Sequence, residues 1–175
     1  MATAFDRGVS AFYWNSGPAH DAFREGLREL AQSSSRESLF VIANGGSPSR
    51  GAGDHRQAER VLEDFALAKR ELGVGYIDLF VLQYIQPYEE SETVLATLDA
   101  LCANRPQTAC PWLARALVIA LPAGAERPCL RRQELKARGE IRYVAMSTHD
   151  FADAVPLIDS GKIDVAMLRY NMAHR

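Results

Sequence analysis

The stretch from Leu72 to Gln83 constrains the fold more than any other part of the sequence. A helical pattern over Ala58–Leu72 runs into Gly73, a residue that commonly ends helices. The run Tyr76–Leu82 that follows is short and almost entirely aromatic or aliphatic, which predicts a strand buried on both faces. Strands of this kind belong to parallel sheets covered by helices. Gln83 stands at the predicted strand end, where parallel α/β folds meet their ligands.

Predicted strands and helices alternate along the rest of the chain. We expect strands over Val9–Trp14, Leu39–Ala43, Tyr76–Leu82, Ile141–Met146 and Ile163–Leu168. We expect helices over Ala22–Ala31, Ala58–Leu72, Thr93–Leu101 and Phe151–Asp159, and Asp21 is expected to cap the first of them. We expect the last turns of two further helices over Ala2–Arg7 and Glu134–Arg138. This order predicts parallel βαβ units with right-handed crossovers. The alternation starts within one unit and stops directly after a strand, so neither end is expected to be a natural domain boundary.

Composition excludes several classes of partner. The net charge is −2 over 175 residues, and no charge run predicts binding to nucleic acid or to an anionic membrane. No apolar run reaches the roughly 18 residues of a membrane span, and the first residues lack a signal-peptide pattern. The three cysteines fit no zinc-binding spacing, so no metal site is predicted and a reducing cytoplasm is the simplest compartment. The length predicts one domain.

The segment Cys102–Gln133 does not fit this pattern. It contains all three cysteines, four of the eight prolines and a single acidic residue, Glu126. Without it, Thr93–Leu101 and Glu134–Arg138 would join into one ordinary helix before Gly139. Two interpretations stay open: a surface insertion in a crossover, or non-native sequence from a retained intron or a frame error.

Four stretches together resemble the aldo-keto reductase family. They are Gly8-Val-Ser-Ala-Phe, Leu72-Gly-Val-Gly-Tyr-Ile-Asp-Leu-Phe-Val-Leu, Gly139-Glu-Ile-Arg-Tyr-Val-Ala-Met-Ser, and Gly161-Lys-Ile-Asp-Val followed by Tyr170-Asn171. The resemblance implies a (β/α) barrel of eight strands that reduces small-molecule carbonyl substrates with NADPH. It implies that this chain holds five of the eight βα units, the second to sixth strands, and is therefore a partial barrel.

The resemblance also implies a catalytic tetrad that this chain does not match. In the family a tyrosine protonates the carbonyl oxygen, lysine and aspartate lower its pKa, and a histidine orients the substrate. Here Tyr13 holds the aspartate position, Gly45 the lysine position and Gln83 the histidine position, and the tyrosine position falls near Pro18. Without the lysine, a tyrosine keeps a pKa of about 10. We therefore expect impaired reduction, with Tyr13 as a substituted acid or as an aromatic that fills the barrel mouth, and Gln83 as a hydrogen-bonding substrate contact.

Part of the family's cofactor site is retained. Ser147 matches the serine that meets the nicotinamide amide, Thr148 replaces an asparagine, and Met167 replaces a glutamine on the next strand. The residues for the adenine phosphate would lie beyond Arg175. The chain is therefore expected to bind NADPH weakly or not at all.

Other interpretations of the function remain. A non-catalytic barrel fragment or binding protein competes with the reductase. His149 is a further candidate for a functional side chain, although a single loop histidine is more often only solvated. A remote alternative is a serine hydrolase that uses Ser47, but Ser49 stands where a nucleophile elbow requires glycine.

The terminal strands of the predicted sheet carry a further expectation. Val9–Trp14 and Ile163–Leu168 are apolar and lack the lysines and prolines that protect natural sheet edges. A closed barrel has no such edges. We therefore expect the isolated chain to self-associate through open sheet edges.

Overall fold

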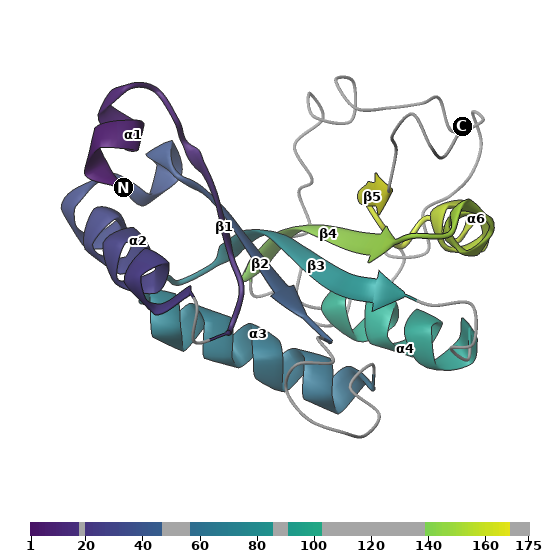
Figure 1. Ribbon diagram of the computed structural model, residues 1–175. Helices are drawn as coiled ribbons and strands as arrows, with labels where there is room; N and C mark the ends of the chain where they lie inside the picture. The colour runs from purple at the N-terminus through teal and green to yellow at the C-terminus, as the bar shows by residue number, and fades with distance from the viewer. Residues whose placement is uncertain (18–19, 47–56, 86–90, 103–138, 169–175) are drawn as a thin grey trace.

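Five parallel strands form one curved sheet in the order β1-β2-β3-β4-β5 (Figure 1). The computed structural model describes residues 1–17, 20–46, 57–85, 91–102 and 139–168. The strands are β1 (Ala11–Trp14), β2 (Phe40–Gly45), β3 (Ile77–Ile85), β4 (Ile141–Thr148) and β5 (Val165–Leu168). Each neighbouring pair is parallel, so the βαβ topology predicted from the sequence is confirmed.

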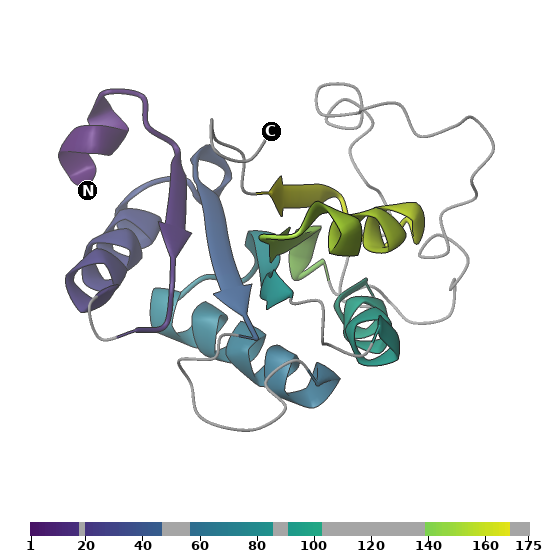
Figure 2. The same cartoon turned by 45° about the vertical axis from the view of Figure 1, so that its right-hand side comes forward.

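Apart from α1, which precedes β1, the helices connect successive strands and lie on the outer side of the sheet (Figures 1 and 2). They are α1 (Ala2–Asp6), α2 (Asp21–Ser33), a 3-10 turn η2 (Arg36–Ser38), α3 (Ala58–Leu72), α4 (Ser91–Cys102) and α6 (Phe151–Asp159). The bounds of α3 and α6 are the predicted ones. Gly73 ends α3 in the left-handed conformation, with φ of +67°, which glycine adopts without strain.

Several predicted bounds differ from the structure. Asp21 is the first residue of α2 and not its cap; His20 is the capping residue and makes no side-chain capping bond. The first and last strands are shorter than predicted, whereas β3 and β4 run further, so Gln83 and Ser147 lie inside strands. The ends of a strand depend on its pairing with neighbouring strands, which cannot be read from the local composition of the sequence.

The two faces of the sheet are packed differently. On the outer face, large buried side chains from strands and helices form the main core, among them Trp14, Leu27, Val41, Val61, Phe65, Phe80, Leu82, Leu98, Val144 and Met146. On the inner face Leu79, Val81 and Ala145 form a smaller buried cluster with partly buried neighbours. Side chains alternate between faces with a period of two, so each strand sends every second residue inward.

A charged cluster occupies the amino ends of the central strands. Asp78 is fully buried and binds Arg36 at 2.6 Å and Arg142 at 2.9 Å. The Tyr76 ring lies against both guanidinium groups, at 3.9 Å from Arg36 and 4.7 Å from Arg142. This cluster was not predicted, because nothing in the sequence shows which arginines meet the carboxylate.

Some predicted features lie outside the described residues: Pro18, Ser47, Glu134–Arg138, and the segment 103–133. Cys102 is the last residue of α4, so the helix extends one residue into the atypical segment. Within the part of the chain that the structure describes, no helix is both long and apolar enough to cross a membrane. The same residues contain no cluster of three or more metal-ligating side chains.

Candidate functional site

Each of the five strands sends one residue near its carboxyl end toward the inner face. These residues are Tyr13, Asn44, Gln83, Ser147 and Met167. On β3 and β4 they continue the alternation of the inner cluster, which contains Leu79, Val81 and Ala145. Ser147 and Met167 are direct partners across β4 and β5. Parallel pairing therefore gathers side chains from distant parts of the sequence at one edge of the sheet.

A pocket of about 230 Å³ opens at this edge. It is lined by Tyr13, Val81, Gln83, Ser147, Thr148, His149, Met167 and Leu168. The structure thus brings together all four site residues predicted from the sequence, and adds His149 to them. Tyr13 is 38% exposed and Gln83 only 7%, so the tyrosine lies at the mouth and the amide lies deeper.

Asn44 supports Gln83 from the neighbouring strand. Its Nδ2 group donates a hydrogen bond to Oε1 of Gln83, and both residues are buried. This bond makes Nε2 the donor end of the Gln83 amide. The Oδ1 atom of Asn44 is buried and has no hydrogen-bond partner in the described structure. Unsatisfied buried acceptors are rare in native proteins and often mark functional positions.

The residue of β2 on the pocket side is Asn44, which corrects the expectation placed on Gly45. A Cβ atom at Gly45 would lie 2.7 Å from Cζ of Phe80 and 3.2 Å from Cβ of Asp64, both in the outer layer. Any side chain at position 45 therefore points away from the pocket. Sequence reasoning missed Asn44 because a shift of one residue moves a strand position to the opposite face.

An irregularity in β3 lies beside the pocket. Leu82 pairs with Met146, and the next paired residues are Ile85 and Thr148. Between these two pairs β3 therefore contains one more residue than β4. Such bulges bend a strand and re-aim side chains, and they are frequent next to active sites. Gln83 lies within this irregular stretch, which therefore sets the direction of its side chain.

Thr148 has a local structural role in addition to lining the pocket. Its Oγ1 atom accepts a hydrogen bond from the Asp150 amide at 3.1 Å, and the residue is 1% exposed. Asp150 in turn caps α6 by accepting the Ala152 amide at 2.8 Å. The strand end, the turn and the start of α6 are therefore held together behind Ser147.

The described lining of the pocket mixes polar side chains with the apolar Val81, Met167 and Leu168. It contains no lysine, arginine or carboxylate, and its titratable groups are Tyr13 and His149. Its volume is below the roughly 300–1,000 Å³ of sites for drug-sized ligands. The arrangement suits hydrogen bonding to a small, neutral, polar group.

Comparison with known proteins identifies a family. The model of the Aldo/keto reductase family matches residues 1–175. No curated protein matches the chain. Solved structures that match include a thermostable aldo-keto reductase, Tm1743, in complex with the inhibitor epalrestat. Its TM-score is 0.62 at 18% identity, covering 97% of this chain and 48% of that one.

Two further matches come from named bacteria. Aldo-keto reductase AKR11C1 from Bacillus halodurans, in its holo form, has a TM-score of 0.62 at 14% identity, covering 97% of this chain and 46% of that one. An aldo-keto reductase from Klebsiella pneumoniae in complex with NADPH has a TM-score of 0.58 at 12% identity, with coverages of 97% and 46%. At these identities the matches show the fold, and the chain spans about half the length of each structure. The prediction of a partial (β/α) barrel is therefore confirmed.

Proposed function

Because the chain belongs to the aldo/keto reductase family, we propose that its strand-end pocket receives the nicotinamide end of NADPH and a small carbonyl compound. The observation that carries this proposal is the pocket itself. It joins Tyr13, Gln83, Ser147 and Thr148, which are far apart in the sequence. One of the matching structures holds NADPH, which supports the choice of cofactor.

The donor groups of the pocket fit such ligands. Gln83 presents Nε2 as a hydrogen-bond donor because Asn44 holds its oxygen, and Tyr13 carries a hydroxyl at the mouth. These two groups would bind the carbonyl oxygen, while the Ser147 hydroxyl would meet the nicotinamide amide. NADPH, when bound, supplies the hydride for carbonyl reduction.

We further propose that reduction by this chain is weak. General acid catalysis works best when the pKa of the acid lies near the working pH, and a nearby cation is one means of lowering the pKa of a tyrosine. The described lining places no lysine or arginine beside Tyr13. The pocket also fits only a small group, so the remainder of a dinucleotide has few described contacts in it.

A non-catalytic binding protein is the competing function. The buried, mutually bonded pair Asn44 and Gln83 favours it, because a neutral amide donates hydrogen bonds but does not transfer protons. The two functions make the same prediction for ligand binding and opposite predictions for NADPH oxidation.

A titration tests the proposal. Trp14 is buried in β1, next to Tyr13, so its fluorescence should report on binding of NADPH. We expect a dissociation constant weaker than about 100 μM, which corresponds to about 5.5 kcal/mol. Gln83→Leu and Ser147→Ala should each weaken binding about tenfold, or about 1.4 kcal/mol, and Ser33→Ala on α2 should not.

The outcomes separate the alternatives. Low-micromolar affinity would show that the expectation of weak binding is wrong. Equal affinities in the wild type and both pocket variants would show that NADPH binds elsewhere. Oxidation of NADPH with small aldehydes, lost in Gln83→Leu, would support the reductase; binding without oxidation would favour the non-catalytic function.

Two further points remain proposals. The hydrolase alternative depends on Ser47, which lies outside the described residues; a fluorophosphonate probe should not label the protein, and labelling abolished by Ser47→Ala would revive it. A cytoplasmic location is a proposal that rests on the cysteine content, because three cysteines are an odd number and do not suggest a disulfide framework.

A further inference from the structure

A buried carboxylate lies on the outer side of the sheet, behind the strand-end pocket. Asp64 belongs to α3, on the face with which this helix packs, and only 4% of it is exposed. Its Oδ2 atom accepts a hydrogen bond from the backbone amide of Gly46 at 2.9 Å. A carboxylate is buried at low cost only where hydrogen bonds replace the water that it loses. The Gly46 amide is therefore one of the partners that stabilise Asp64 at this position.

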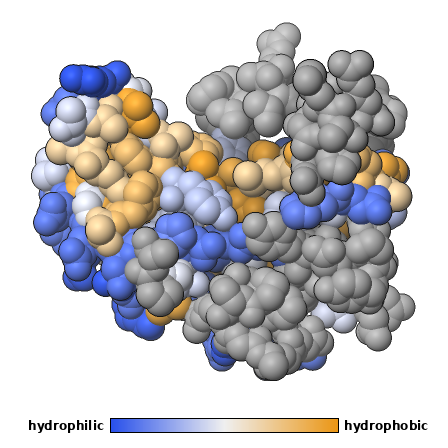
Figure 3. All heavy atoms as spheres, in the orientation of Figure 1, coloured by the Kyte–Doolittle hydropathy of each residue, from blue (hydrophilic) through white to orange (hydrophobic). Residues whose placement is uncertain are grey.

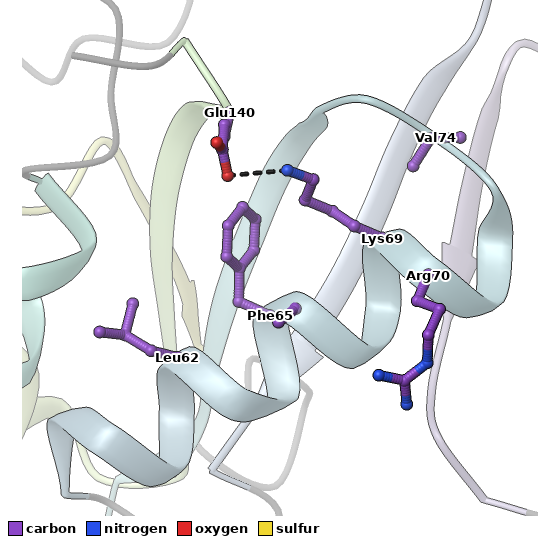
Figure 4. Close-up of a pocket in the computed structure, with 7 residues that line it drawn as sticks. Leu62, Phe65, Lys69, Arg70, Val74 and Glu140 are labelled. Atoms are coloured by element: carbon purple, nitrogen blue, oxygen red, sulfur yellow. Dashed lines mark hydrogen bonds and ion pairs between the residues drawn. The ribbon is translucent and has the colours of Figure 1, made fainter. Parts of the chain in front are cut away.

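The helix that carries Asp64 is held against the sheet by neighbouring contacts. Phe65 packs edge-on against Phe80 of β3, with 5.3 Å between the ring centroids. About one turn further along α3, Lys69 binds Glu140 at 2.7 Å, just before β4 begins (Figure 4). The position of Asp64 is thus set by contacts that α3 makes with β3 and with the start of β4.

The end of β2 is confined by the same helix. Gly45 is the last residue of β2, and a Cβ atom there would lie 2.7 Å from Cζ of Phe80 and 3.2 Å from Cβ of Asp64. The next residue, Gly46, has φ of +70°, which glycine adopts without strain. Close packing and the bond to Asp64 therefore fix the path of two adjacent glycines, which are the residues with the most backbone freedom.

This fixed strand end continues directly into the candidate site. Asn44 immediately precedes Gly45, and its Nδ2 group donates a hydrogen bond to Oε1 of Gln83, which lines the pocket. Adjacent residues of a strand point to opposite faces, so α3 contacts β2 from the outside while Asn44 acts on the inside. Only two residues, or about 7 Å of strand, separate Asn44 from the amide that Asp64 binds.

We propose that Asp64 is a positioning residue of the strand-end pocket: it holds the Gly46 amide, and thereby keeps Asn44 bonded to Gln83 with Nε2 of Gln83 as the donor. Without this acceptor the two glycines gain conformational freedom, and the Gln83 amide is released. A released amide can turn its oxygen toward the carbonyl oxygen of a ligand, and two acceptors do not bond to each other. The consequence for ligand binding rests on the proposed function of the pocket, whereas the effect on Asn44 does not.

Hydrogen exchange in the ligand-free protein tests this coupling. NMR measures how fast the Nδ2 hydrogens of Asn44 exchange with water, and we expect exchange about tenfold faster in Asp64→Ala, because the bond to Gln83 opens more often. Asp64→Asn keeps an oxygen that accepts the Gly46 amide, and should restore exchange to within about twofold of the wild type. Val61→Ala is the matched control, because it removes buried volume from the same face of α3 and no partner of Gly46.

Titration with NADPH measures the consequence for the pocket. Asp64→Ala should weaken binding about fivefold, the worth of one hydrogen bond, and Asp64→Asn by less than about twofold. In a chain that already carries Gln83→Leu, Asp64→Ala should have no further effect, because Asp64 acts through Gln83. If Asp64→Ala does not fold, Asp64→Leu takes its place, since it fills the buried site with an apolar side chain.

Three results would overturn the proposal. Unchanged exchange at Asn44 in Asp64→Ala would show that Asp64 does not position it. Equally fast exchange in Val61→Ala would assign the effect to general loosening of α3. Equal effects of Asp64→Asn and Asp64→Ala would show that the charge matters and the hydrogen bond does not. If the wild-type chain does not bind NADPH, only the proposed function fails, and the exchange rates still decide the role of Asp64.

Discussion

The two ends of the parallel sheet carry different kinds of buried polar residue: charged at the amino ends of the strands and neutral at the carboxyl ends. At the amino ends, Asp78 is fully buried and paired with Arg36 and Arg142. At the carboxyl ends, the inward residues Asn44 and Gln83 are neutral, and one buried acceptor has no described partner. In barrels of this type the amino end serves stability and the carboxyl end carries the site. The charge distribution in this chain follows that division.

Carboxylates at the amino ends also extend the sheet's hydrogen bonding. Asp78 accepts the backbone amide of Val41 at 2.9 Å, and Asp164 accepts that of Val144 at 2.8 Å. In both cases an acid at the start of one strand binds the backbone of its neighbour. The amino end is thereby locked, while the carboxyl end keeps polar groups that are directed toward a ligand.

The largest expected effect on stability comes from removing the buried carboxylate at the amino end of the sheet. Asp78→Ala leaves two arginines and the Val41 amide without their shared partner, and should lower the free energy of unfolding by about 3–5 kcal/mol. Urea denaturation measures it. The control, Asp99→Ala, breaks a pair with Lys162 in which the aspartate is half exposed, and should cost at most about 1 kcal/mol. Equal effects would remove the distinction between the locked end and an ordinary surface.

A change in the packing at the carboxyl end of the sheet should destabilise the protein less. Gly45→Ala places Cβ 2.7 Å from Cζ of Phe80, so it should destabilise the protein by about 1–3 kcal/mol. Gly75→Ala is the matched control, because no atom lies within 4 Å of a Cβ there. A neutral result for Gly45→Ala would mean that Phe80 moves aside readily, and that the outer layer behind the pocket is loosely packed.

The third prediction concerns self-association through the exposed edges of the described sheet. In the described structure β1 and β5 are its edges, and Tyr13 in β1 and Met167 in β5 are 38% and 43% exposed. Figure 3 shows apolar residues over the side of the molecule that carries α1 and β1. We expect the isolated chain to self-associate at tens of micromolar, and Met167→Lys to weaken this about tenfold, which is about 1.4 kcal/mol.

Sedimentation analysis measures this association. Val155→Lys is the control, because Val155 is 54% exposed on the helix α6 and belongs to neither edge strand. A monomer at all concentrations would contradict the expectation of association. Dissociation by Val155→Lys alone would assign the contact to α6 and not to an edge.

Much of the candidate site could be predicted from the sequence. Gln83, Ser147 and Thr148 are found as residues at strand ends, and Tyr13 through the family resemblance. A parallel sheet brings such strand ends to one edge. The bounds of α3 and α6 followed from apolar periodicity and from glycines that stop helices. The partners of Asp78 could not be found in this way, because Arg36 and Arg142 are 42 and 64 residues away.

The sequence by itself determined the order and direction of the strands, because buried apolar runs separated by amphipathic helices have one favourable arrangement. Only the tertiary structure decided which residue of each strand enters the pocket. Asn44 and Gly45 are adjacent, yet one bonds to Gln83 and the other faces Phe80. The choice depends on strand register and on the irregularity in β3, which are set by pairing between strands. A side chain's face alternates with every residue, so a pattern that locates a strand end to within one position cannot name the residue that serves the site.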